Sequence, residues 1–219
     1  MNSPQSLLAV FNRLFDRNGP LKWWPADTPF EVCVGAILTQ NTAWSNVEKA
    51  ISSLKQAGIM SPETLHGCDP EQLARLIRPA GYFNVKSRRL QDFTSWLFLN
   101  HQGSLERMCA GNWQVLREEL LRVRGIGPET TDSILLYAGN KPSFVVDAYT
   151  RRLFRRLGLL PEAAGYDETR ALFMNNLPED VALFNEYHAQ IVEQCKQFCR
   201  VKPLCSGCPL DNSCPSKLM

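Results

Sequence analysis

Apolar side chains recur at helical spacing along almost the whole 219-residue sequence. Positions three and four apart share one face of an α-helix, whereas a half-buried strand alternates apolar and polar residues. No convincing run of strict alternation occurs, so we predict an all-α protein of about ten helices. Clear examples of the helical spacing are Leu7, Leu8, Phe11, Leu14 and Phe15, then Val47, Ala50, Ile51 and Leu54, then Leu90, Phe93 and Leu97.

Capping signals predict where several of these helices begin and end. Ser61-Pro62-Glu63 and Asp69-Pro70-Glu71 each place a capping side chain before a proline and an acidic residue. This order is typical of a helix start, because proline suits the first turn and an acidic side chain suits the positive helix end. Glycines stand where helices should stop, at Gly58, Gly81, Gly103, Gly139 and Gly158.

Composition is that of a globular protein and does not by itself indicate a nucleic-acid binder. The 24 Lys and Arg residues nearly balance the 22 Asp and Glu residues, which leaves a net charge of +2. No apolar stretch is long enough to cross a bilayer, so we expect a cytoplasmic protein without a membrane partner. Five of the eight cysteines crowd between Cys195 and Cys214, which favours a metal site over scattered disulfides.

The segment from Leu120 to Ala138 predicts two helices joined by a tight hairpin. A helix should end near Arg122, and a second should begin at Pro128 after Gly125, Ile126 and Gly127. Glycine permits a positive φ and a close approach of backbone amides to another object. Amides converging at a helix start can hold a phosphate, although an ordinary helical hairpin would read the same if the motif stood alone.

About twenty residues later, the apolar run Phe144-Val145-Val146 leads into Asp147, which should open another helix. With this order of pieces, and with the C-terminal cysteines, the chain resembles the helix-hairpin-helix, Gly/Pro, Asp superfamily of DNA glycosylases, which includes endonuclease III. The resemblance runs over nearly the whole chain. It implies a monomer that binds double-stranded DNA with a damaged base, flips that base out and cuts its N-glycosidic bond.

The resemblance also implies a two-lobed helix-hairpin-helix glycosylase fold with a C-terminal iron–sulfur cluster loop. We expect a six-helix lobe over residues 27–138 and a second lobe made of residues 1–26 and 139–219. The cluster loop falls at about residues 195–214. An active cleft between the lobes would receive Asp147 from one side and Trp44 from the other.

Asp147 is the expected catalytic residue. On residue type alone it is a helix cap, and the resemblance adds a role in stabilising the positive charge that develops on the deoxyribose. Relatives that also nick the backbone carry a lysine two residues after the second hairpin glycine, where this sequence has Glu129. A carboxylate cannot form the imine of a lyase, so the resemblance implies a monofunctional glycosylase that uses water.

The aromatic residues near the N-terminus resemble one subgroup, the endonuclease III-related 3-methyladenine DNA glycosylases. On residue type alone, a pair of adjacent tryptophans belongs to the hydrophobic core about as often as it forms a surface on which a ligand stacks. The resemblance makes Trp44 the stacking residue, Trp23, Trp24 and Pro25 the pocket wall, and Lys196 a pocket lysine. It also suggests Gln40 as the polar side chain that fills the gap left by the flipped nucleotide. A cationic alkylpurine would suit an indole pocket.

Cys199, Cys205, Cys208 and Cys214 supply four thiols that could hold either a [4Fe-4S] cluster or one zinc ion. The resemblance favours iron–sulfur. In that superfamily six residues usually separate the first two cluster cysteines, whereas five residues separate Cys199 from Cys205 here. Cys195 therefore remains an alternative first ligand. Arg200 and Lys202 in the intervening loop are expected to contact DNA phosphates.

Three questions stay open on the sequence. Arginines 151, 152, 155 and 156 either form a solvated helix face or meet DNA. The enzyme could belong instead to a branch for oxidised pyrimidines or mismatched adenine. A non-catalytic iron–sulfur or zinc DNA-binding module is a rival of a different class.

Overall fold

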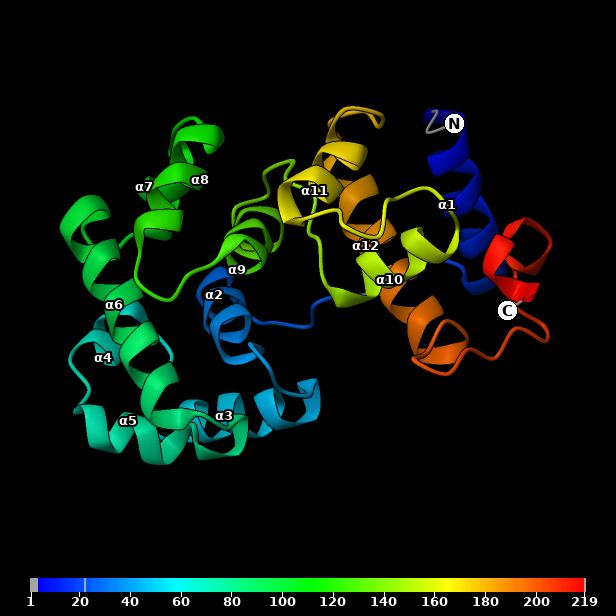
Figure 1. Ribbon diagram of the computed structural model, residues 1–219. Helices are drawn as coiled ribbons and strands as arrows, with labels where there is room; N and C mark the ends of the chain where they lie inside the picture. Colours follow the sequence, from blue (N-terminus) through cyan, green and yellow to red (C-terminus); the bar gives the residue numbers. More distant parts are fainter. Residues whose placement is uncertain (1–3, 22, 219) are drawn as a thin grey trace. The chain divides into compact units, whose positions relative to one another are not determined.

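The computed structural model describes residues 4–21 and 23–218, which contain twelve α-helices with short 3-10 and π segments and no strand (Figure 1). The prediction of an all-α protein is therefore confirmed. The chain divides into two compact units. One unit is Trp24–Lys141, and the other joins Met1–Trp23 to Pro142–Met219.

The unit Trp24–Lys141 is built around α2 (Pro29–Leu38), which packs against α3 (Trp44–Gln56), α6 (Phe83–His101) and α9 (Pro128–Ser133). Every residue of α2 from Phe30 to Leu38 is buried. A helix that is apolar nearly all round belongs at the centre of a core, and α2 takes that place. Its end therefore presents the Thr39–Ala43 loop from a fixed support.

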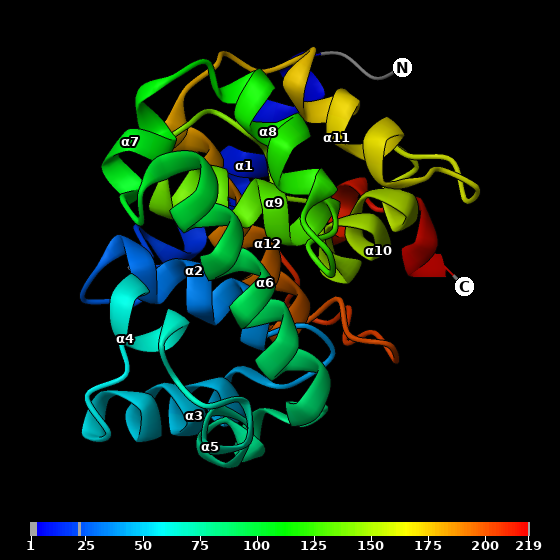
Figure 2. The same ribbon diagram turned by 90° about the vertical axis from the view of Figure 1, so that its left-hand side faces the viewer.

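The predicted capping signals are confirmed in this unit. Ser61 caps α4 (Pro62–His66) in a capping box with Thr64, and Asp69 caps α5 (Pro70–Leu76) by accepting from two backbone amides. The 3-10 turn η1 (Arg78–Ala80) follows α5, and α6 then packs across α4 and α5. The views agree that α3 and α5 lie side by side (Figures 1 and 2).

The predicted helical hairpin is present. After α7 (Leu105–Ala110), α8 (Trp113–Arg122) ends where expected and α9 begins at Pro128. Gly125 has φ +83°, as the turn requires, but Gly127 has φ −92° and ψ 177°, an extended conformation open to any residue. Gly127 therefore does not use the positive φ that glycine permits, because it serves as the N-cap position of α9. The helix then continues as a π segment, η2 (Ile134–Ala138).

The second unit contains α1 (Pro4–Asn18), α10 (Ala148–Arg156), α11 (Tyr166–Met174) and α12 (Val181–Gln197), followed by the 3-10 turns η3 (Asp211–Ser213) and η4 (Pro215–Leu218). Both α1 and α10 pack against α12. The core between them is aromatic, since the rings of Phe144 and Phe173 stack with centroids 3.9 Å apart and Tyr187 meets both rings edge-on. Offset and edge-on pairs of this kind add about 0.5–1.5 kcal/mol each beyond area burial. This core fixes α10 and α12 against each other.

Within the described part of the chain, no helix is both long enough and apolar enough to cross a bilayer.

Candidate functional site

Asp147 stands at the junction of a buried extended segment and α10. Val145 and Val146 before it are 1% exposed, and its own side chain caps the helix, as the sequence predicted. Its Oδ1 accepts hydrogen bonds from the backbone N (2.7 Å) and the Oγ1 (2.9 Å) of Thr150. The carboxylate is thus held by its own helix through one oxygen, which leaves Oδ2 to interact elsewhere.

The second oxygen of Asp147 faces a histidine. Oδ2 lies 3.5 Å from Nε2 of His188 on α12, and the Asp147 side chain is only 15% exposed. Burial acts to raise the pKa of Asp147, but His188 and the two Thr150 hydrogen bonds outweigh it and lower that pKa below its usual value. Asp147 is therefore a desolvated carboxylate that stays ionised.

His188 also lies against Trp23, and Trp23 against Lys196. The imidazole and the Trp23 ring meet edge-on with centroids 5.9 Å apart, and Lys196 Nζ lies 5.6 Å from the Trp23 ring centroid. The structure thus brings two residues predicted from the sequence, Asp147 and Trp23, to one histidine, and places a third, Lys196, over Trp23. The sequence did not point to His188, because no local pattern marks a histidine that faces an aspartate far away in the chain.

The Trp23 indole carries a buried donor. Its Nε1 has no hydrogen-bond acceptor among residues 4–21 and 23–218. A buried N–H without an acceptor costs about 1–3 kcal/mol, so such groups in native proteins usually meet a water or a ligand.

A second aromatic group lies in the unit Trp24–Lys141. Trp24 stacks on Tyr137 of η2 (4.8 Å, 23°) and meets Trp44 edge-on (5.2 Å). Both indoles pack on the bare backbone of Gly35 on α2, where a Cβ would lie 3.5 Å from Trp44 and 3.6 Å from Trp24. Pro25 is exposed beside them. Tyr137 was also missed, although its place in a π segment is a known mark of functional positions.

Gln40 is bound into the protein. Its Nε2 donates to Gly125 O (3.1 Å) and Thr130 Oγ1 (2.8 Å), and its Oε1 accepts a short hydrogen bond from Arg89. These bonds tie the Thr39–Ala43 loop to the hairpin. For Gln40 to enter DNA, all three would have to break, whereas the next residue, Asn41, is exposed with a left-handed backbone at φ +55°.

The hairpin itself is exposed at both glycines and buried at Ile126, which is 3% exposed. The Arg89 side chain crosses Gly125 so closely that a Cβ there would lie 2.5 Å from its Cγ. Glu129 is exposed in the first turn of α9. A hollow beside the hairpin is lined by Val85, Arg88, Arg89, Asp92, Arg124 and Gly125. Three of these are arginines, so the hollow is positively charged and suits an anion.

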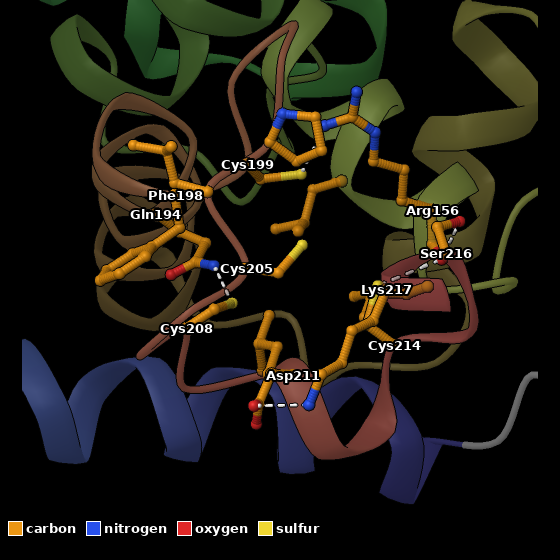
Figure 3. A pocket seen from close by; sticks show the side chains of 15 residues that line it. Arg156, Gln194, Phe198, Cys199, Cys205, Cys208, Asp211, Cys214, Ser216 and Lys217 are labelled. Carbon is orange, nitrogen blue, oxygen red and sulfur yellow. Dashed lines mark hydrogen bonds and ion pairs between the residues drawn. The ribbon is translucent and has the colours of Figure 1, made fainter. Parts of the chain in front are cut away.

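The four predicted ligand thiols, Cys199, Cys205, Cys208 and Cys214, line one pocket at the end of α12 (Figure 3). Gln194 Nε2 donates to the Cys208 sulfur (3.0 Å). Cys195 does not line this pocket, and its thiol donates instead to Tyr149 O at 3.6 Å. Cys199 therefore lies with the other three thiols, and Cys195 does not.

Two of the four arginines on α10 hold the cysteine segment. Arg152 Nε donates to Cys199 O (2.7 Å), and Arg156 donates to Arg200 O (2.6 Å) and Val201 O (2.9 Å). The Arg156 Nη1 that donates to Arg200 O also lies 3.3 Å from the Cys199 sulfur. These two side chains therefore bind the cysteine segment, while Arg200 and Lys202 are exposed.

The donor set of the pocket fits a metal cluster chemically. The neighbouring Cys195 thiol, together with the Arg156 and Arg152 guanidiniums, lowers the pKa of Cys199 against the effect of burial, which favours the thiolate form that binds metal. Among the residues described, no three His, Cys, Asp or Glu side chains converge closely enough to hold a single ion.

Comparison with known families identifies a match over most of the chain. Residues 34–179 match the model described as "HhH-GPD superfamily base excision DNA repair protein". A protein of Methanocaldococcus jannaschii, named as a candidate DNA repair glycosylase, is 48% identical over 218 residues, which cover 99% of each chain. Endonuclease III of Thermotoga maritima is 30% identical over 187 residues, covering 85% of this chain and 82% of its own.

Solved structures agree in fold. A 3-methyladenine DNA glycosylase from H. pylori, bound to 1,N6-ethenoadenine, is 32% identical with a TM-score of 0.72, covering 89% of this chain and 95% of its own. A trapped endonuclease III–DNA covalent intermediate superposes with a TM-score of 0.84 at 20% identity over 99% of this chain and 97% of its own. At 20% identity, the similarity to the endonuclease III complex shows only that the two folds are alike.

Proposed function

Since the chain belongs to the HhH-GPD superfamily of base excision DNA repair proteins, and is a DNA repair glycosylase of that family, we propose that it is a monofunctional enzyme for alkylated purines. Its substrate would be 3-methyladenine or a related cationic purine in double-stranded DNA. The enzyme would act as a monomer, flip the damaged base and leave an abasic site.

One observation carries this proposal: Asp147 is a buried carboxylate that stays ionised beside the wall formed by Trp23. When the bond between the base and the sugar C1′ breaks, the electron pair leaves with the base and positive charge develops on the sugar. A fixed negative charge in a desolvated place stabilises that charge most. Water then adds to C1′ and loses a proton.

The aromatic residues support a cationic base as substrate. Methylation at N3 gives adenine a positive charge, which makes it a good leaving group and a partner for an indole face. We propose Trp44 and Trp23 as stacking surfaces, and Trp24 and Pro25 as supporting wall. The free N–H of Trp23 would meet an acceptor on the base or a water. Lys196 already lies over Trp23 and would limit how deeply the base enters.

Glu129 supports a glycosylase without lyase activity. Its carboxylate is exposed in the first turn of α9 and cannot form an imine with the sugar. Borohydride should therefore trap no covalent adduct between this protein and DNA. A trapped adduct would require another amine to act as nucleophile and would contradict this part of the proposal.

We propose the hairpin Gly125-Ile126-Gly127, together with Arg200 and Lys202, as the DNA-docking surface. Phosphate contacts of this kind fix position on the duplex without reading its sequence. Gln40 is proposed to fill the gap left by the flipped nucleotide, which requires it to leave its bonds to Gly125 O and Thr130 Oγ1.

The four thiols of Cys199, Cys205, Cys208 and Cys214 are proposed to hold a [4Fe-4S] cluster. When bound, the cluster would order the C-terminal loop, and base hydrolysis itself needs no electron transfer. Four thiols lining one pocket, with hydrogen bonds from Gln194 and Arg156 to sulfur, support this assignment.

The decisive experiment is the release of free bases from DNA treated with a methylating agent, with the released bases identified by chromatography. We expect 3-methyladenine as the main product. Faster excision of thymine glycol, or of adenine opposite 8-oxoguanine, would assign the enzyme to another branch. Tight DNA binding with no base released from any of these substrates would favour a non-catalytic DNA-binding protein.

A further inference from the structure

The two oxygens of the Asp147 carboxylate are held by different elements. Oδ1 accepts both bonds from Thr150 on the same helix, and Oδ2 lies 3.5 Å from His188 Nε2 on α12. Resting on the function proposed above, we infer that His188 is a positioning residue, which fixes the plane of the Asp147 carboxylate for glycosidic cleavage.

His188 has little freedom to move. It is 4% exposed and lies next to Tyr187, whose hydroxyl donates to Leu7 O at 2.7 Å. Tyr187 is also part of the aromatic core with Phe144 and Phe173. A side chain locked by packing can orient a neighbouring group within the tolerance that catalysis requires. The distance of 3.5 Å is long for a hydrogen bond, and such contacts often tighten once substrate is bound.

His188 also contacts the proposed base pocket. The imidazole touches both the Trp23 indole, edge-on at 5.9 Å between centroids, and the Asp147 carboxylate. Movement of Trp23 as a base stacks on it would therefore press on the group that orients Asp147. No metal role is needed to explain the burial of this histidine.

The charged and titratable groups near His188 come from the start of α10 and from α12. Asp147 at the N-cap of α10 faces the imidazole, Lys196 on α12 lies over the Trp23 ring, and Cys195 on α12 interacts electrostatically with Asp147. Burial raises the pKa of Asp147, and without the imidazole only the Thr150 hydrogen bonds would lower it, so the pKa of Asp147 would rise. The excision rate would then fall at a higher pH than in the wild type.

Two substitutions separate positioning from packing. Glutamine places an amide N–H near the position of Nε2, so His188→Gln should keep most of the single-turnover excision rate of 3-methyladenine. His188→Leu removes the donor, and we expect the excision rate at neutral pH to fall at least about tenfold. On the acid side of the pH–rate profile, the fall in rate should occur about one pH unit higher than in the wild type. DNA affinity should stay within about twofold, because the step affected is bond cleavage. His66→Gln, at an exposed histidine in the other unit, is the control.

A second readout does not depend on activity. The carboxyl carbon of Asp147, observed by NMR in labelled protein, should titrate at higher pH in His188→Leu than in the wild type. His188→Asn is the smaller replacement if leucine prevents folding, and it should give the same shift. Unchanged rates and unchanged titration, or equal losses in the glutamine and leucine variants, would overturn the inference. A wild-type enzyme that releases no base would instead overturn the proposed function, while the titration would still test the contact.

Discussion

At the scale of single residues, Asp147 combines a structural and a chemical task in one carboxyl group. Oδ1 caps α10 through Thr150, and the negative charge is what the proposed chemistry needs. The two tasks respond differently to substitution, because a neutral amide oxygen can still accept the capping hydrogen bond. Asp147→Asn should therefore leave the free energy of unfolding within about 1 kcal/mol of wild type while lowering excision at least about a hundredfold.

The matched control for Asp147→Asn is Asp180→Asn. Asp180 caps α12 in the same way, with its Oδ1 accepting from Leu183 N at 3.0 Å, but it is exposed. Single-turnover excision, DNA affinity and denaturant unfolding are measured for both variants. Excision by Asp147→Asn at the wild-type rate would remove Asp147 from the chemistry, and an equal loss in Asp180→Asn would point to a general effect of helix capping.

At the scale of elements, alanine substitutions at the two hairpin glycines should have different effects on stability. Gly125 has φ +83° and lies under Arg89, so a Cβ there is strained and collides. Gly125→Ala should cost about 1–2 kcal/mol of stability. Gly127 is extended, and no atom lies within 4 Å of where its Cβ would be. Gly127→Ala should fold normally.

DNA binding then tests whether the hairpin approaches phosphate closely. If the backbone at Gly127 meets DNA, Gly127→Ala should weaken DNA affinity about tenfold or more without loss of stability. Thermal unfolding and fluorescence-anisotropy titrations separate the two effects. Wild-type affinity in Gly127→Ala would show that DNA does not come near this position.

Lys86 links two loops at the element scale. Its Nζ donates to Leu38 O (2.8 Å) at the end of α2 and to Ala80 O (2.7 Å) in η1. Burial, with a smaller effect from Arg89, lowers its pKa to about 8. Between about pH 8 and the usual lysine value of about 10.4, the unfolded chain binds a proton that the folded protein does not, so stability gains from rising pH.

This linkage predicts a pH-dependent difference between wild type and Lys86→Met. The wild-type free energy of unfolding should gain about 1–3 kcal/mol relative to the variant across that range, while the variant is less stable throughout because two carbonyls lose their donor. Lys55→Met is the control, because Asp27 and Glu31 raise the pKa of Lys55 and its linkage has the opposite sign. A constant difference between wild type and Lys86→Met would show that Lys86 stays charged in this range.

At the scale of the whole molecule, local patterns predicted the all-α class, the caps at Ser61 and Asp69 and the helix that begins after Asp147. Helical periodicity and capping depend on residues a few positions apart, so they can be read directly from the sequence. The contacts of His188 with Asp147, and of Gln40 with Gly125, join residues far apart in the chain, and no local pattern encodes them. For the same reason, the sequence did not indicate that Arg152 and Arg156 bind the cysteine segment.

The cysteine pocket gives a prediction for the assembled protein, because α10, α12 and the C-terminal segment all contribute to it. Cys199→Ser removes a thiol that lines the pocket, whereas Cys195→Ser removes one that donates to Tyr149 O outside it. Purified Cys199→Ser should lose most of its iron and its visible absorption, and Cys195→Ser should keep about four iron atoms per chain. Loss of iron in Cys195→Ser alone would make Cys195 the first ligand, and stoichiometric zinc in the wild type would replace the cluster by a single ion. Because a bound cluster stabilises only the folded chain, the Cys199→Ser variant should also unfold at a lower temperature than Cys195→Ser.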